Sequence, residues 1–175
     1  MDGIVIVDKP QDWTSQDVVS KLRGVLKTRR IGHGGTLDPM ATGVLPVFVG
    51  RGTRGVEFFE HAEKTYEAVL RLGISTDTED ITGTVLEEKE VKITEEQFLS
   101  VLENFRGEIQ QIPPMYSAIK RGGKRMYQLA RKGEIVELEA RKCRVDGVEV
   151  DPLVAFAPEI IGSGEYRMLT GGITA

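Results

Sequence analysis

Residues 32–43 read Gly-His-Gly-Gly-Thr-Leu-Asp-Pro-Met-Ala-Thr-Gly, and the rest of the chain is organised around this stretch. Four of these twelve residues are glycines, whose backbone permits positive φ angles and the close approach of a ligand. Pro39 fixes its own φ and moves Asp38 away from helical conformations. Asp38 is therefore a carboxylate in a rigid glycine-rich loop, which suits catalysis. The alternative is that the segment is only a turn.

The loop matches neither common phosphate-binding motif. No Gly-Lys-Ser/Thr follows it, which excludes a Walker-type loop, and the spacing of a dinucleotide fingerprint is absent. Residues 44–49, Val-Leu-Pro-Val-Phe-Val, come directly after it and predict a buried strand. We therefore expect the loop to be anchored to a sheet, as functional loops often are.

Further elements are predicted on both sides of the loop. Upstream, residues 3–7 form a β-branched run typical of a buried strand, and Thr14 with Asp17 predicts the capped start of a helix that ends near Lys27. A polar turn is expected at residues 77–83 and an extended segment at residues 112–118. The other expected elements are a helix at 56–61, strands at 64–72 and 85–88, a helix from 94 with Gly107 as its C-cap, a helix at 125–132, and a strand pair at 136–150 that turns at Asp146 and Gly147.

The composition is that of an ordinary soluble globular protein. The chain has 175 residues, of which 40% are hydrophobic and 29% charged. It has no apolar run of about 18 residues, and residues 1–3 lack a basic signal region. A lone cysteine, Cys143, is interpreted as structural and fits a reducing compartment. We therefore expect a cytoplasmic protein without a membrane partner. Two histidines and one cysteine do not favour a zinc site.

The positive charges are clustered, although the net charge is −4. Residues 115–133 contain no acidic side chain, and Tyr116 and Tyr127 are interleaved with their cations. A second group, Lys27, Arg29 and Arg30, comes just before the loop. Cations gathered beside a candidate active loop are typical of a protein that binds a phosphate polymer. The alternative is a solvated helix end and a solvated face.

Several motifs of the chain, taken in order, resemble those of the TruB family of tRNA pseudouridine synthases. They lie at residues 7–10, 32–46, 64–66, 111–120 and 125–131, within a match that runs from about residue 3 to residue 145. The resemblance implies an α+β fold, with a mixed, mostly antiparallel sheet flanked by helices and a catalytic aspartate on a loop. It implies isomerisation of a uridine in the T-loop of tRNA to pseudouridine, the T-arm stem-loop as partner, and neither metal nor organic cofactor.

The same resemblance implies roles for individual residues. Asp38 would be the catalytic aspartate, Tyr66 would pack against the target base, and His33 would meet the displaced nucleotides. Lys9 and Pro10 belong to a motif that supports the catalytic loop, and we also count Lys9 among the RNA-binding residues. The other expected RNA-binding residues are Lys120, Lys124, Arg125 and Arg131.

These roles agree with the chemistry of base modification. A base inside a folded RNA must be flipped into a pocket, where an aromatic face can stack on it. A carboxylate can act as a covalent nucleophile. Attack of Asp38 at C6 of the ring, attack at C1′ of the sugar, and removal of a sugar proton all stay open. Without the resemblance, Tyr66 reads as a half-exposed strand tyrosine and His33 as a histidine that bonds its own turn.

The chain departs from the family's pattern after residue 168. Family members carry a Cys-Ser-Lys-Gly-Thr-Tyr-Ile-Arg type motif there, whose arginine pairs with the catalytic aspartate, and later a C-terminal PUA domain. Here residues 169–175 read Leu-Thr-Gly-Gly-Ile-Thr-Ala. We therefore expect residues 1–175 to form a single partial catalytic domain, without the PUA domain and with slow or absent turnover. A fragment and a natural short form both stay open, as does the oligomeric state.

Two other functions compete with this interpretation. A non-catalytic tRNA-binding or RNA-folding module derived from the family would keep the groove and lose turnover. A carboxylate-dependent hydrolase ranks lower, because no second acid is obviously paired with Asp38.

Overall fold

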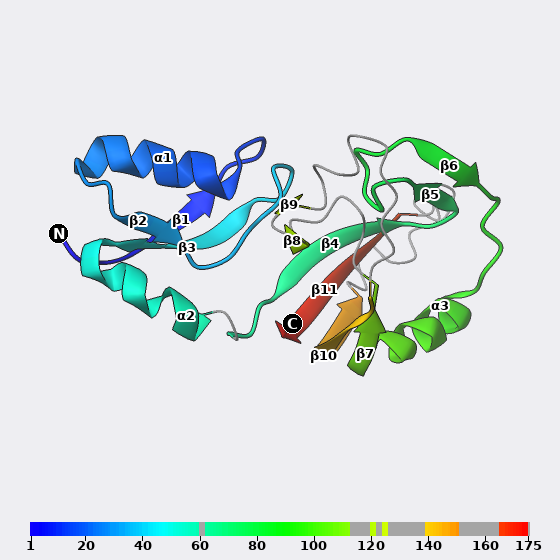
Figure 1. Cartoon of the computed structure of the whole chain (residues 1–175). Helices are drawn as coiled ribbons and strands as arrows, with labels where there is room; N and C mark the ends of the chain where they lie inside the picture. Colours follow the sequence, from blue (N-terminus) through cyan, green and yellow to red (C-terminus); the bar gives the residue numbers. More distant parts are fainter. Residues whose placement is uncertain (60–61, 113–119, 122–123, 126–138, 151–164, 175) are drawn as a thin grey trace. The chain divides into compact units, whose positions relative to one another are not determined.

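A computed structural model describes residues 1–59, 62–112, 120–121, 124–125, 139–150 and 165–174 (Figure 1). Internal contacts divide the chain into two compact units, Met1–Ala62 and Glu63–Ala175. Each unit contains an antiparallel sheet and at least one helix, so the fold is α+β, as expected. The single catalytic domain expected from the sequence stays a prediction.

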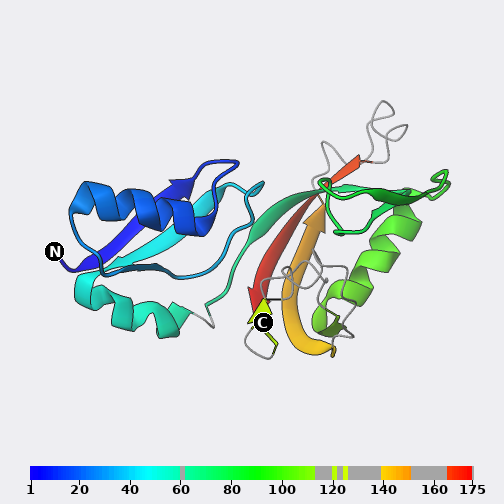
Figure 2. The same cartoon turned by 45° about the horizontal axis from the view of Figure 1, so that its top comes forward.

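The first unit is built on a three-stranded antiparallel sheet with the order β1-β3-β2. Its elements are β1 (Gly3–Lys9), α1 (Ser15–Leu26), β2 (Ile31–His33) and β3 (Gly43–Val49). Figures 1 and 2 both show α1 along one face of this sheet. The core between them consists of Val18, Val19, Ile31, Leu45, Val47 and Val49. Helix α1 and the sheet thus fix the ends of the loop that carries Asp38.

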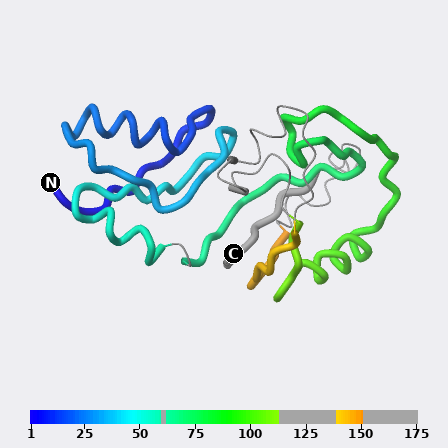
Figure 3. Tube along the Cα trace, viewed as in Figure 1, coloured from blue at the N-terminus to red at the C-terminus, as the bar shows by residue number. Residues whose placement is uncertain are grey.

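Helix α1 begins and ends where its sequence predicts. The Thr14 hydroxyl accepts a hydrogen bond from the Asp17 amide, and the Asp17 carboxylate accepts one from the Thr14 amide. This reciprocal pair satisfies two amides at the helix start. Lys27 follows the last helical residue with a left-handed φ of 50°. The chain then turns back into β2, as Figure 3 traces.

The opposite face of the sheet is more exposed than the sequence predicts. Ile4 and Ile6 are 50% and 63% exposed, whereas Val5 and Val7 pack against the core below α1. The expectation of a buried strand is therefore confirmed for the face of β1 that carries Val5 and Val7 and wrong for the face that carries Ile4 and Ile6. On β3, Phe48 is covered on this face, because its ring meets the Phe59 ring edge-on at 5.1 Å.

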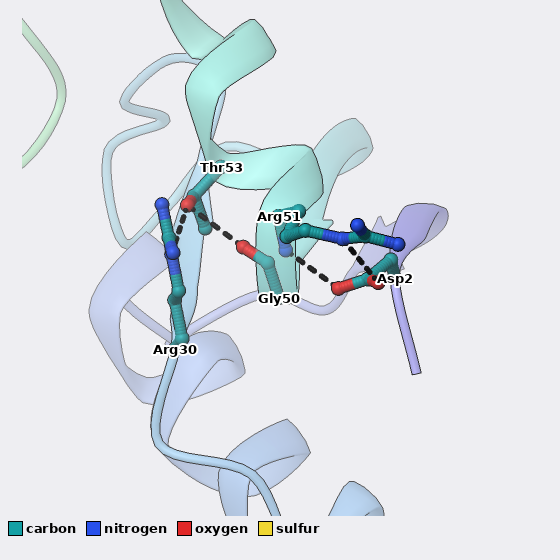
Figure 4. Close-up of polar contacts among 5 residues, drawn as sticks. All are labelled: Asp2, Arg30, Gly50, Arg51 and Thr53. Atoms are coloured by element: carbon teal, nitrogen blue, oxygen red, sulfur yellow. Dashed lines mark hydrogen bonds and ion pairs between the residues drawn. The ribbon is translucent and has the colours of Figure 1, made fainter.

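A short helical segment follows β3 and holds the start of the chain (Figure 4). It consists of the 3₁₀ turn η1 (Gly50–Gly55) and helix α2 (Val56–Phe59); the predicted helix residues 60–61 lie outside the described residues. The Arg51 amide and Nε donate to the two carboxylate oxygens of Asp2 at 2.6 and 2.9 Å. These bonds lower the pKa of Asp2. Arg30 Nε donates to the Thr53 hydroxyl at 2.8 Å on the same side of the unit.

The second unit is built on a four-stranded antiparallel sheet with the order β4-β11-β10-β7. These strands are β4 (Tyr66–Arg71), β7 (Gly107–Gln111), β10 (Arg141–Val150) and β11 (Glu165–Thr174). Helix α3 (Glu95–Leu102), followed by the 3₁₀ turn η2 (Glu103–Phe105), contributes Phe98 and Leu102 to a core with Val145 and Val148. Two hairpins complete the described part: β5 (Ile74–Thr76) with β6 (Val85–Glu88), and β8 (Lys120–Arg121) with β9 (Lys124–Arg125).

Tertiary pairing overrides two local signals in this unit. The prediction of a turn at Asp146 and Gly147 is wrong, because β10 continues through these residues. Strand β7 pairs with β10 up to Val145, and β11 pairs with it from Arg144 to Val150. Gly107 has a φ of +79° but begins β7 instead of capping α3, which ends at Leu102.

Other expectations in this unit have mixed outcomes. The polar turn is confirmed, because the Asp80 carboxylate accepts hydrogen bonds from the hydroxyls of Thr78 and Thr82 at 2.8 and 2.6 Å. Arg125 lies in a strand and not at the start of a helix, and residues 126–132 lie outside the described residues. So do residues 113–118 of the expected extended segment. Cys143 is buried on β10, which agrees with a structural role.

Candidate active site

The loop between β2 and β3 presents Asp38 at the surface of the first unit. The Asp38 side chain is exposed, and no lysine or arginine among the described residues forms an ion pair with it. The Asp38 carbonyl accepts a hydrogen bond from the Ala41 amide at 3.1 Å, which closes a turn. Gly43 then enters β3 with a φ of +109°, a conformation that favours glycine.

The start of the loop lies tightly against β3. The Gly34 amide donates to the Pro46 carbonyl at 2.8 Å. A side chain at Gly34 would place its Cβ 2.7 Å from a ring carbon of Phe48. Glycine is therefore needed here for close packing, while the positive φ expected from the glycine-rich pattern occurs at the other end of the loop, at Gly43.

Lys9 supports the loop from below. Its side chain is completely buried at the end of β1. Nζ donates to the carbonyl oxygens of Pro10, Trp13 and Pro39 at 2.9, 2.6 and 3.2 Å. An ammonium group has three donors, and here each one has an acceptor, which offsets the cost of burying the charge. The Pro39 contact joins β1 to the residue that follows Asp38.

Two further groups hold the same loop. The Asp12 amide donates to the Pro39 carbonyl at 2.8 Å. The Ser15 hydroxyl accepts a hydrogen bond from the Leu37 amide at 2.9 Å and donates to the Leu37 carbonyl at 3.3 Å. The residues on both sides of Asp38 are thus held by the segment between Lys9 and Ser15.

Sequence reasoning missed Ser15 and the Asp12 amide. One signal for Ser15 was available, because it lies three and four residues before Val18 and Val19 on the apolar stripe of α1. A serine at a core-facing helix position must find a partner for its hydroxyl. The Asp12 contact uses a backbone group and left no signal in the sequence.

The sequence placed His33 in the glycine-rich loop. In the structure it is instead the last residue of β2, opposite Val47 of β3. A strand of three residues is too short to show a periodic pattern in the sequence. It is recognised by its pairing with β3 in the structure. The side chain is half-buried, and Nδ1 is buried without a hydrogen-bond partner among the described residues. A buried ring nitrogen in this condition is costly unless a ligand or water satisfies it.

Tyr66 is the first residue of β4 and pairs with Thr170 of β11. Its side chain is 37% exposed, which leaves part of the ring accessible to a flat ligand. Tyr66 belongs to the second unit and Asp38 to the first.

The expected cations lie in several places. Lys120 is in β8 and Lys124 and Arg125 are in β9, where Lys120 pairs with Arg125 and Arg121 with Lys124. Arg131 lies outside the described residues. Lys9 has no exposed surface through which to contact RNA, so its binding role has no support in the geometry, whereas its supporting role corresponds to three hydrogen bonds.

The group Lys27, Arg29 and Arg30 does not lie beside Asp38, although it precedes the loop in the sequence. Arg30 leads into Ile31, which pairs with Val49 at the end of β3. The loop instead joins β3 at its start, Gly43, which pairs with Lys9. Because β3 has seven residues at about 3.3 Å each, the two ends are roughly 20 Å apart.

Within the described residues, no cluster of histidine, cysteine, aspartate or glutamate is suited to hold a metal ion. The same part of the chain has no helix of the length and apolarity needed to cross a membrane.

These observations define a class of protein: an α+β scaffold that presents one carboxylate on a glycine-rich loop held on both sides. A family model, the TruB family pseudouridylate synthase (N terminal domain), matches residues 23–158. The chain therefore belongs to the TruB family.

Relatives with curated names agree with this assignment. The chain is 49% identical over 173 residues to tRNA pseudouridine synthase B of Microcystis aeruginosa, a match that covers 95% of this chain and 59% of the relative. It is 53% identical over 146 residues to tRNA pseudouridine synthase B of Solibacter usitatus, covering 83% of this chain and 50% of the relative. The chain thus spans about half the length of the curated relatives it matches.

Solved structures share the fold. The crystal structure of a Cbf5-Nop10-Gar1 complex matches with a TM-score of 0.69 and 28% identity, over 99% of this chain and 40% of that chain. A structure of an H/ACA RNP bound to a substrate RNA containing 2′-deoxyuridine matches with a TM-score of 0.65 and 24% identity, over 99% and 38% of the two chains, and supports the fold alone.

Proposed function

We propose that this chain takes part in the isomerisation of a uridine in the T-loop of tRNA to pseudouridine, with Asp38 as the catalytic nucleophile. The observation that carries the proposal is the loop geometry: an exposed carboxylate whose two neighbours, Leu37 and Pro39, are hydrogen-bonded to a rigid scaffold. Membership of a pseudouridylate synthase family supports it. A positioned carboxylate can attack an electrophilic carbon, and positioning alone can lower a barrier by several kcal/mol.

The reaction replaces a nitrogen–carbon glycosidic bond with a carbon–carbon bond. The base must detach, rotate and reattach in a closed pocket, so it must first be flipped out of the folded RNA. In the proposal, the half-exposed ring of Tyr66 stacks on the flipped base. As a nucleophile, Asp38 attacks C6 of the base or C1′ of the sugar. In the alternative mode, the same carboxylate acts as a base and removes a sugar proton. No metal or organic cofactor is invoked.

The remaining site residues bind RNA. His33 meets the displaced nucleotides, and the half-buried state of this residue leaves surface for such a contact. Lys120, Lys124, Arg125 and Arg131 contact phosphates of the T-arm stem-loop, where each contact displaces a counter-ion. Lys9 supports the loop and does not touch RNA.

The direct test is incubation with an unmodified tRNA transcript, followed by mapping of pseudouridine at single-nucleotide resolution. The proposal expects pseudouridine at one T-loop position with the parent chain and none with Asp38→Asn, which keeps the shape and removes the nucleophile. Asp12→Asn is the matched control, because Asp12 is exposed near the same loop and its contact with the loop is made by its backbone amide, which the substitution keeps. Equal activity of Asp38→Asn and the parent would refute the role of Asp38.

A second candidate function is tRNA binding without efficient turnover. The favouring observation is that, in the described ranges, no cation pairs with the Asp38 carboxylate. A paired arginine orients a carboxylate, and loss of such a preorganised contribution is worth about 3 kcal/mol, or roughly a hundredfold in rate. Measurable binding of a T-arm stem-loop with slow or absent isomerisation would favour this candidate. Multiple turnovers by residues 1–175 would exclude it.

A further inference from the structure

We propose that Ser15 is a positioning residue for Asp38. Its hydroxyl fixes the backbone of Leu37, one residue before the carboxylate, and completes a two-sided clamp with the groups that hold Pro39. The chemical consequence rests on the function proposed above, but the clamp itself is a property of the fold that can be tested without activity.

The contact between Ser15 and Leu37 is reciprocal. The Ser15 hydroxyl accepts from the Leu37 amide at 2.9 Å and donates to the Leu37 carbonyl at 3.3 Å. The side chain is 2% exposed, so water cannot readily replace either bond. A buried hydroxyl left without partners is costly, and both its donor and its acceptor capacity are used here on a single residue. This contact determines where the Leu37 backbone lies.

The position of the hydroxyl is in turn set by the core. Ser15 is the first residue of α1 and lies directly after Thr14, the N-cap that forms a capping box with Asp17. One turn later, Val18 and Val19 are buried against the sheet. The position of Ser15 is therefore set by the start of α1, which packs on the sheet. Through its bonds to Leu37, Ser15 ties the position of the loop to that of the helix.

The other side of Asp38 is held independently. The Pro39 carbonyl accepts from Lys9 Nζ at 3.2 Å and from the Asp12 amide at 2.8 Å. With Leu37 and Pro39 both fixed, the freedom left to Asp38 is mainly rotation about its side-chain bonds. Such restraint matters for catalysis, because a displacement of about 1 Å can cost on the order of a hundredfold in rate.

The first experiment measures amide hydrogen exchange in the whole chain. In Ser15→Ala, the Leu37 amide should exchange at least about tenfold faster, while the amides of Val18 and Val19 keep their rates. Ser20→Ala is the matched control: Ser20 lies on the same helix, is exposed, and donates to the Gln16 carbonyl. An unchanged Leu37 amide, or equal acceleration throughout the first unit, would overturn the clamp.

The second experiment separates positioning from binding. Single-turnover isomerisation of a T-arm stem-loop should slow by about tenfold to a hundredfold in Ser15→Ala, with an unchanged Kd for the RNA. Ser15→Cys, which keeps a weaker hydrogen-bonding group on a somewhat larger side chain, should give intermediate values in both experiments. It also replaces Ser15→Ala if the alanine variant does not fold.

The two proposals fail in different ways. If the parent chain does not isomerise uridine but Leu37 exchange accelerates in Ser15→Ala, the clamp stands and the proposed function fails. If the parent is active and Ser15→Ala matches it in rate and in Leu37 exchange, Ser15 has no positioning role.

Discussion

At the scale of single residues, Lys9 is a charged side chain that needs several hydrogen-bond partners, because it is buried in the first unit. Its ammonium group is buried and bonded to three carbonyl oxygens. The resemblance of residues 7–10 to a family motif implied its supporting role, but its burial could not be predicted. Lysine is almost never fully buried, and the carbonyls that accept from it belong to residues up to 30 positions away.

Lys9→Met should lower the free energy of unfolding by about 2–4 kcal/mol. Methionine fills a similar volume but removes the Lys9 donor from the carbonyls of Pro10 and Trp13, and it leaves the Pro39 carbonyl with the Asp12 amide as its donor. Urea unfolding measures the change. Lys21→Met on the exposed side of α1 is the control and should stay within about 0.5 kcal/mol of the parent. A Lys9→Met variant as stable as this control would contradict the account.

At the scale of elements, local sequence signals determined the helix starts and failed where pairing partners decide. Thr14 and Thr94 each begin a helix through a capping box that the sequence displays. The strand β2 was not predicted, because three residues are too few to show a periodic pattern. The single strand β10 was predicted as two strands joined by a turn, because Asp-Gly is a strong turn signal. In β10, pairing with β11 from Arg144 to Val150 outweighs that local preference.

The capping box of α1 should make its stability depend on pH. Hydrogen bonds from the Thr14 hydroxyl and amide lower the pKa of Asp17 below its usual 3.8. A carboxyl with a lowered pKa in the folded state stabilises that state above about pH 4, and this contribution is lost as the pH falls through the folded-state pKa. Asp17→Asn should therefore reduce the loss of stability between about pH 5 and pH 2.5 in urea unfolding.

The α3 box provides an internal control for this pH dependence. Its third helical residue is Gln97, whose neutral side chain makes the same contact with the Thr94 amide at 2.9 Å. Thr94→Ala should cost about 1 kcal/mol at both ends of the pH range. If Asp17→Asn and the parent lose stability in parallel on acidification, the Asp17 contribution is absent.

At the scale of the whole molecule, the division into two compact units was not visible in the sequence. The composition gave no linker signal, and the length suited one domain. The units have separate cores, one below α1 and one below α3. The α+β class was predictable from the family motifs, whereas the number of cores depends on which strands pair.

Separate cores should respond separately to cavities. Phe48 is buried against Phe59 in the first unit, and Phe98 is buried in the second. Either residue replaced by alanine should cost about 3–5 kcal/mol in its own unit. Amide exchange should accelerate in β1 and β3 for Phe48→Ala, and in β10 for Phe98→Ala. Equal acceleration in both units for each variant would instead mean that they unfold together.

The strands β8 and β9 place like charges opposite each other, with Lys120 against Arg125 and Arg121 against Lys124. Residues of like charge at facing register positions destabilise an antiparallel pair in general. Added salt should therefore tighten this hairpin, whereas it weakens hairpins joined by ion pairs. A polyanion should stabilise this strand pair at a far lower concentration than simple salt does, because its negative charges are covalently joined.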